Sequence, residues 1–153
     1  MIELVATVSR LLVGSLLLYA GALKIPEPAL FAETIKAYDV LPIETIHAFA
    51  VVVPWVEVVS GVLLIAGLRV RGAALTTLGL LVAFAIAIGV NLYRGADFSC
   101  GCFGFDGGGG SLGTAAMRVV VLMMLSCVVV VVDRSPLSMD RLLARSEGLT
   151  EGE

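Results

Sequence analysis

Four long apolar runs dominate the pattern of hydrophobic and polar positions along the chain. They cover residues 4–23, 46–68, 72–93 and 113–132, and nearly all of the charged residues lie between them. A hydrocarbon core about 30 Å thick needs roughly 20 apolar residues, because a helix rises about 1.5 Å per residue. Each run is long enough, so the pattern predicts an all-α integral membrane protein built as a four-helix bundle.

The first run also fits a secretory signal peptide, because Ala20-Gly21-Ala22 resembles a small-residue cleavage site near the start of the sequence. Two features argue against it. The residues before the run carry an acid, Glu3, where signal peptides carry positive charge, and the run is longer than a usual signal core. We therefore interpret it as a membrane helix.

The connection after the first run predicts a short amphipathic helix between Pro26 and Pro42. Its charged positions alternate with apolar residues at helical spacing, namely Leu30, Phe31, Ile35, Tyr38 and Leu41. Such a helix lies at the membrane interface. We favour a role as a lid that fixes the first loop over a role as a partner-binding face.

Composition supports the membrane interpretation and excludes one class of partner. The chain is 59% hydrophobic and 15% charged, whereas soluble domains carry about 25% charged residues. The net charge of -3 and the scattered Lys and Arg residues provide no basic surface for nucleic acid. We expect a four-helix domain over residues 1–132, in contact with the lipid bilayer, and a short cytoplasmic tail over residues 133–153.

The distribution of Lys and Arg predicts the orientation. The second connection and the tail hold five of them, against three in the other two connections; the five are Arg69, Arg71, Arg134, Arg141 and Arg145, and the three are Lys24, Lys36 and Arg94. Positive charge favours the cytoplasmic side. We predict a multi-pass protein of the cell (inner or plasma) membrane with both termini cytoplasmic. The first and third connections then face the extracytoplasmic side, where thiols meet oxidising conditions.

Cys100 and Cys102 stand one residue apart in the third connection, ahead of four consecutive glycines. A bridge between them would close a small, strained ring, and strained disulfides are the exchanging kind. Such a bridge closes almost no loop and would stabilise little, which argues against a permanent staple or two idle thiols. A zinc site is a third interpretation, but the chain has one His and no second Cys pair, too few soft ligands.

Three ionisable residues lie within the predicted spans: Arg10, Glu57 and Arg118. Such residues are costly in a membrane and often functional. Counting helical rise from the cytoplasmic ends puts Arg10 and Glu57 within side-chain reach, so we predict an intramembrane ion pair. It would hold two helices in register or handle protons.

Several polar residues are expected to converge near the cysteines. Arg118, Asn91 and Arg94 lie at helix ends next to the Cys segment, where a cation would favour the thiolate. Arg118 could instead extend to the lipid headgroups. His47, at the outer end of the second span, could relay a proton or be inert. Cys127 is predicted to be a small buried apolar residue outside the site.

A family resemblance rests on two sets of residues. One is Asn91-Leu-Tyr-Arg-Gly with Ser99-Cys-Gly-Cys-Phe-Gly104 and an Arg in the next helix; the other is Arg10, Gly21, Lys24, Pro54, Glu57, Gly61 and Gly67. The chain resembles the MauE and DoxX group from Arg10 to about Val132. This implies redox work outside the cytoplasm, since MauE is associated with maturation of a disulfide-rich methylamine dehydrogenase subunit beside a thioredoxin-like partner. DoxX-like relatives are tied to quinone-linked or thiol-linked oxidoreductase complexes.

Together these features predict a membrane thiol-disulfide oxidoreductase that uses Cys100 and Cys102 with an extracytoplasmic thioredoxin-like or client protein. Without a second Cys pair, a membrane quinone is the expected second electron carrier. The alternative is a non-catalytic anchor or assembly subunit of a redox or maturation complex. A transporter ranks last, because four short helices without paired repeats make a poor one.

Overall fold

The part of the chain that the structure describes is an all-α membrane bundle of four spanning helices and one short helix. In this computed structural model, residues 2–95 and 112–132 are described. They form α1 (Ile2–Lys24), α2 (Pro28–Tyr38), α3 (Ile43–Ala66), α4 (Val70–Tyr93) and α5 (Leu112–Val131). All except α2 are long and apolar enough to cross a membrane. The fold class predicted from the sequence is confirmed, while the predicted tail, residues 133–153, lies outside the described residues.

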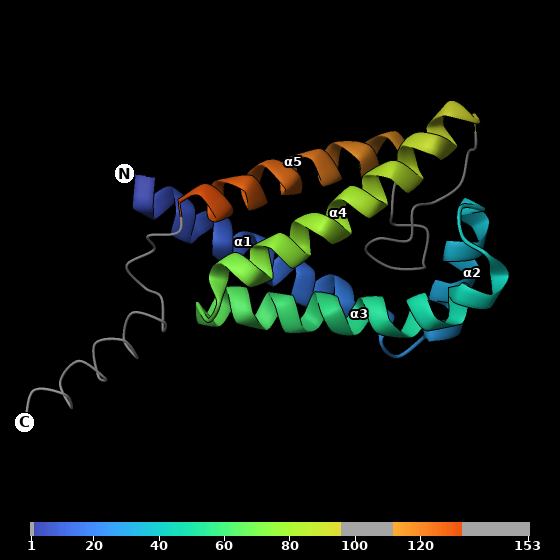
Figure 1. Ribbon diagram of the computed structural model, residues 1–153, viewed down its shortest axis with the longest axis horizontal. Helices are drawn as coiled ribbons and strands as arrows, with labels where there is room; N and C mark the ends of the chain where they lie inside the picture. Colours follow the sequence, from blue (N-terminus) through green and yellow to red (C-terminus); the bar gives the residue numbers. More distant parts are fainter. Residues whose placement is uncertain (1, 96–111, 133–153) are drawn as a thin grey trace, which may run out of the picture.

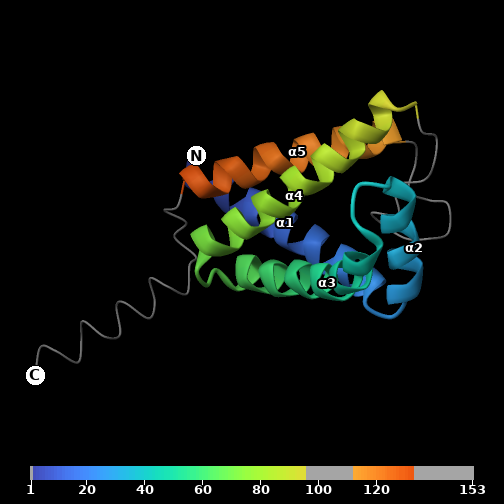
Figure 2. The ribbon, with the colours of Figure 1, turned by 45° about the vertical axis from the view of Figure 1, so that its right-hand side comes forward.

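The spanning helices form two closely packed pairs, α1 with α3 and α4 with α5. The α1–α5 and α3–α4 contacts close the bundle, and α2 packs against α3 and α4. α2 lies at one end of the bundle, and the start of α1 and the end of α5 lie at the other (Figure 1). The turned view in Figure 2 shows the C-terminal end of α4 and the beginning of α5 near α2. We call this end of the molecule the α2 end.

Glycines bring α1 and α3 into backbone contact. A side-chain carbon added at Gly14 would lie 2.9 Å from Cγ1 of Ile65 and 3.0 Å from the Gly61 carbonyl oxygen. A carbon added at Gly61 would lie 2.8 Å from the Gly14 carbonyl oxygen. Small residues permit such close approach between membrane helices, where packing drives association. α1 is therefore an integral part of the bundle, in agreement with the membrane-helix interpretation of the first run.

Helix ends differ from the apolar runs by a few residues. α3 begins at Ile43 and α4 at Val70, each before its apolar run, because a helix continues past the hydrocarbon into polar residues. Gly67 caps the C-terminal end of α3, and its φ of 72° is the left-handed conformation that glycine adopts easily. α2 starts with Pro28, since proline suits the first helical turn. It lies within the predicted segment from Pro26 to Pro42.

Three clusters of buried side chains hold the helices together. One joins the four spanning helices through residues such as Val13, Leu64, Ala74 and Val129. The other two seat α2: Phe31 and Ala32 pack with α3, and Tyr38 packs with α4 and α5. The prediction for Cys127 is wrong, because its side chain is exposed on α5. Lipid and protein interior are equally apolar, so hydropathy alone does not distinguish the two faces of a membrane helix.

Candidate functional site

A buried ion pair joins α1 to α3 in the half of the bundle nearer α2. Lys24 and Glu57 are 3% and 4% exposed, and Lys24 Nζ donates hydrogen bonds of 2.8 Å to each of the two carboxylate oxygens. Nζ also lies 5.0 Å from the ring centroid of Phe31 and 5.5 Å from that of Phe84. Aromatic faces attract a cation, so the ammonium is stabilised by a carboxylate and two rings.

Local sequence explains why these two side chains meet. Gly21 lies one turn before Lys24, and a carbon added to it would lie 2.8 Å from the Pro54 carbonyl oxygen and 3.2 Å from Glu57 Cβ. The missing side chain lets α1 approach α3 at the level of the carboxylate. Lys24 is also the last residue of α1, where the negative end of the helix dipole favours a cation.

The predicted pair of Arg10 with Glu57 is wrong, because the Glu57 carboxylate is bound by Lys24. The contact of Gly14 with Gly61, together with that of Gly21, puts Glu57 level with residues 18 to 21 of α1. That level is about 12 to 16 Å from Arg10 by helical rise. The sequence-based prediction assumes that the ends of α1 and α3 lie at the same depth. The glycine contacts instead shift one helix along its axis relative to the other. Arg10 is buried elsewhere, at 3% exposure.

Sequence reasoning missed Lys24 as a site residue and counted it as a loop charge. A usable signal is present: an apolar helix continues to Lys24 without a break, and Pro26 follows. A lysine in the last turn of such a helix can reach back into the bundle. Without Lys24, the second connection and the tail together hold five Lys and Arg residues, and the first and third connections together hold two.

Two cavities meet at the ion pair. The larger, about 360 Å³, lies between α2, α3 and α4 and has mostly apolar walls, with Lys24, Phe31, Tyr38, Phe49, Phe84 and Ala87 among its lining residues. The smaller, about 50 Å³, lies between the spanning helices and is lined in part by Lys24, Glu57, Phe84 and Arg118. Lys24 and Phe84 line both cavities. An ion pair beside an apolar cavity of this size is a site at which a small ligand could be bound and oriented.

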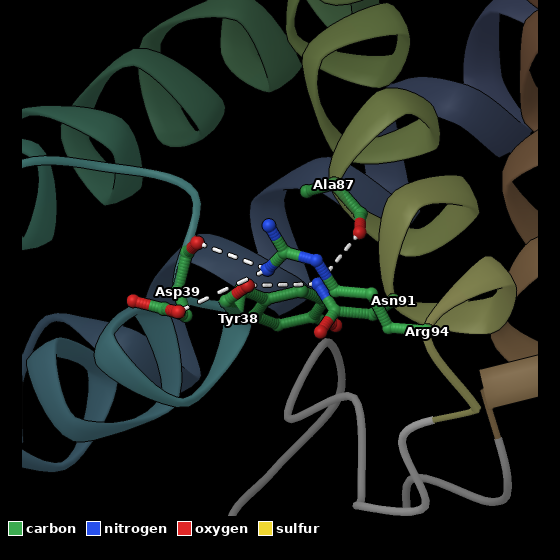
Figure 3. A network of polar contacts seen from close by, with 5 residues as sticks. All are labelled: Tyr38, Asp39, Ala87, Asn91 and Arg94. Carbon is green, nitrogen blue, oxygen red and sulfur yellow. Dashed lines mark hydrogen bonds and ion pairs between the residues drawn. The ribbon is translucent and has the colours of Figure 1, made fainter.

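Asn91 and Arg94 bind the C-terminal end of α2 (Figure 3). Asn91 Nδ2 donates hydrogen bonds to the carbonyl oxygens of Tyr38, at 2.8 Å, and Ala87, at 2.9 Å. Arg94 Nη1 donates to the carbonyl oxygen of Asp39 at 3.2 Å and lies 3.9 Å from its carboxylate. Carbonyls at a helix end need such partners. These two predicted site residues therefore fasten α2 to α4.

The other predicted site residues lie apart from one another. Arg118 is exposed on α5 and lines the smaller cavity with Lys24 and Glu57. His47 is exposed on α3 and lines neither cavity, so its role as a proton relay stays a prediction. Cys100 and Cys102 lie outside the described residues.

The helices that flank the Cys segment meet at the α2 end of the bundle. Ala115, in the first turn of α5, belongs to the same buried cluster as Tyr38 of α2 and Ile88 of α4. The end of α4 and the start of α5 therefore meet at the α2 end, as Figures 1 and 2 also show. Both helix ends to which the Cys segment is attached therefore lie at the α2 end.

In the comparison with protein families, the family described as methylamine utilisation protein MauE matches residues 2–132. Comparisons with curated proteins and with solved structures found no match. The MauE part of the predicted resemblance is confirmed, and the DoxX part stays a prediction. The matched region contains all four spanning helices and α2. This chain is therefore a multi-pass membrane protein that belongs to the MauE family.

Proposed function

We propose that this protein is a membrane thiol-disulfide redox protein that exchanges electrons through Cys100 and Cys102 with an extracytoplasmic thioredoxin-like or client protein. Membership of the MauE family supports the broader role of a membrane protein in a redox or maturation system. The observation that carries the finer proposal is the Cys-Gly-Cys spacing on the segment that joins α4 to α5. A bridge across one residue is strained, and strain makes a disulfide prone to exchange.

The exchange transfers two electrons and two protons. A thiolate of the partner attacks the bridge between Cys100 and Cys102, forming a mixed disulfide and releasing the other cysteine as a thiolate. The second thiol of the partner, as thiolate, then attacks the mixed disulfide. The partner leaves as a disulfide, and the chain holds the dithiol after its thiolates take up the two protons. The reverse sequence reduces a disulfide in the partner.

Two arginines support this chemistry. Arg94 and Arg118 lie near the two ends of the Cys segment, and both are exposed. A neighbouring cation stabilises a thiolate and lowers the thiol pKa. Arg94 contacts Asp39 through Nη1 in a solvent-exposed pair, which is weak. Asn91 acts as a positioning residue, because it holds α2 against α4 beside the segment.

We further propose that both termini and the tail are cytoplasmic, so that the cysteines face the extracytoplasmic side of the cell membrane. The bias of five Lys and Arg residues against two supports this orientation. The test uses intact cells that carry the Cys127→Ser variant: after reduction with a phosphine that cannot cross the membrane, Cys100 and Cys102 are labelled with a maleimide that cannot cross it either. Strong labelling before lysis is expected, and labelling only after lysis would contradict the orientation.

A second candidate function is a non-catalytic anchor or assembly subunit. It is favoured by one observation: the side chain of Asn91 is engaged by α2 and needs no chemical role. In this case the Cys pair would be dispensable for binding the partner. Because the family is described as methylamine utilisation, proteins of such a system are the first clients to test.

Substitution of the cysteines separates the two functions. The protein with Cys100→Ser and Cys102→Ser is compared with the wild type and with Cys127→Ser, the matched control on the exposed face of α5. The probe is a reduced thioredoxin-like protein mixed with the oxidised membrane protein in nanodiscs. An exchange protein oxidises the probe, and the double variant does so at least tenfold more slowly, while Cys127→Ser behaves as wild type. Equal rates for all three would refute the proposal and favour the anchor.

A further inference from the structure

We propose that the larger cavity binds the ring of a lipid-soluble quinone and that Lys24 donates a hydrogen bond to a ring carbonyl. The proposal rests on the proposed function, because it names the carrier that exchanges electrons with the Cys pair. A bound quinone would supply a two-electron, two-proton acceptor for the dithiol. Four properties of the cavity support the proposal: its volume, its access from the membrane, the charges beside it and the aromatic residues of its walls.

Size and access suit a ligand that arrives from the membrane. The volume of about 360 Å³ falls in the range of roughly 300 to 1,000 Å³ that small-molecule sites show. Apolar lining residues that are exposed include Val40, Phe49 and Ile86, at 41%, 44% and 58%. Phe49 and Ile86 belong to spanning helices, so we infer that the cavity opens toward lipid beside them. A ligand dissolved in the bilayer can therefore enter without crossing water.

The charges at the cavity favour a neutral ligand. Among the described residues that line the larger cavity, Lys24 is the one that carries a charge, and Glu57 balances it. A fatty-acid carboxylate would compete with Glu57 for the ammonium and place two negative charges side by side. A cationic ligand would meet the ammonium itself. Both arrangements are costly at low dielectric.

Lys24 has one hydrogen-bond donor left for a ligand. An ammonium carries three N–H groups, and Glu57 Oε1 and Oε2 accept two of them. In the described part of the chain Nζ has no third acceptor, although Lys24 is 3% exposed. Since Lys24 lines the cavity, a carbonyl oxygen on a bound ligand can accept the remaining hydrogen. A buried donor gains free energy from being satisfied in this way.

Aromatic walls favour a planar ring over a saturated chain. Phe31, Phe49 and Phe84 all line the cavity, and two of them flank Nζ at 5.0 and 5.5 Å. Aromatic side chains contact flat rings by offset stacking or edge-to-face packing. A quinone is planar, uncharged and membrane-soluble and has two carbonyl acceptors. It matches each feature of the cavity, whereas an acyl chain uses only the apolar walls.

The test fills the cavity without disturbing the ion pair. Ala87 lines the cavity and is half-buried, so Ala87→Leu reduces the space for a ring. Ala48→Leu is the matched control, because Ala48 is exposed on α3 and lines neither cavity. The probe is a short-chain ubiquinone titrated into protein in nanodiscs, with binding read by equilibrium dialysis. We expect Ala87→Leu to raise the Kd at least tenfold and Ala48→Leu to change it less than twofold. A second test removes the donor: Lys24→Met combined with Glu57→Met, which leaves no buried charge, should raise the Kd at least fivefold, and Lys36→Met should have no effect.

Unchanged binding in Ala87→Leu, or no saturable binding of the quinone, overturns the proposal. Saturable binding of lauric acid to the wild type that quinone does not displace would identify an acyl chain as the occupant. This result would also overturn the proposal. The variant Cys100→Ser with Cys102→Ser keeps the cavity and should bind quinone as wild type does. Quinone binding without thiol exchange would thus refute the proposed function alone, and exchange without quinone binding would refute this inference alone.

Discussion

Removing the ammonium of Lys24 should destabilise the bundle strongly. Lys24→Met leaves the Glu57 carboxylate 4% exposed in the native packing and deprives both of its oxygens of their 2.8 Å hydrogen bonds. Removing one partner of a buried ion pair costs about 3 to 5 kcal/mol, because the other charge stays buried and uncompensated. The exposed contact of Arg94 with Asp39, at 3.9 Å, provides the comparison, since such pairs contribute about 0 to 1 kcal/mol.

A double-mutant cycle measures the coupling directly. We would determine the free energy of unfolding in mixed micelles for Lys24→Met, Glu57→Met and the double variant. The double variant should recover most of the loss, because two apolar side chains of similar volume leave no buried charge. If each single variant loses about 3 to 5 kcal/mol and the double variant about 1 kcal/mol, the coupling free energy is about 5 kcal/mol or more. Asp39→Asn, as the control at an exposed pair, should change the stability by less than about 1 kcal/mol.

The same assay tests the helix register. Arg10 lies about 12 to 16 Å from the level of Glu57 by helical rise, so Arg10→Met and Glu57→Met should be additive within about 0.5 kcal/mol. A coupling of about 2 kcal/mol between Arg10 and Glu57, with none between Lys24 and Glu57, would refute the reasoning. Such a result would restore the pair expected from the apolar runs alone.

Two further predictions concern the glycine contact and pH. Gly21→Ala places a carbon 2.8 Å from the Pro54 carbonyl oxygen and must push α1 from α3, so we expect a loss of about 1 to 3 kcal/mol in thermal unfolding. Gly72→Ala meets no atom within 4 Å and should be neutral or slightly stabilising; equal losses for both variants would contradict the contact. Burial raises the pKa of Tyr38 from its ordinary 10.0 to about 12, so its stabilising contribution is complete below pH 10.0 and disappears as the pH rises toward about 12. Tyr38→Phe should flatten stability against pH in that window and remove the tyrosinate absorbance change near pH 12, and a wild-type profile that is already flat there would contradict the shift.

Much of the fold follows from hydropathy and periodicity. Apolar length predicts the four spanning helices, because the bilayer thickness fixes how many residues a span requires. The alternation of Phe31 and Tyr38 with charged residues predicts α2, whose buried face packs on α3 and α4. These features depend on local composition, which a sequence displays directly.

The relative heights and faces of the helices could not be predicted in the same way. The partner of Glu57 depends on an offset between α1 and α3 that arises where Gly14 contacts Gly61. The exposed position of Cys127 depends on which face of α5 meets its neighbours, and an all-apolar helix does not reveal this. The hydrogen bonds of Asn91 to α2 join residues 53 positions apart, so no local pattern announces them.

The reduction potential of the Cys100–Cys102 pair tests the proposed redox function most directly. It can be measured on purified protein in detergent by the mass shift on thiol alkylation across glutathione buffers of known potential. We predict a bridge that titrates between about −120 and −270 mV, the range of known exchange catalysts. Failure to form a bridge, or a bridge that resists reduction below about −300 mV, would contradict thiol-disulfide exchange and leave the anchor function in its place.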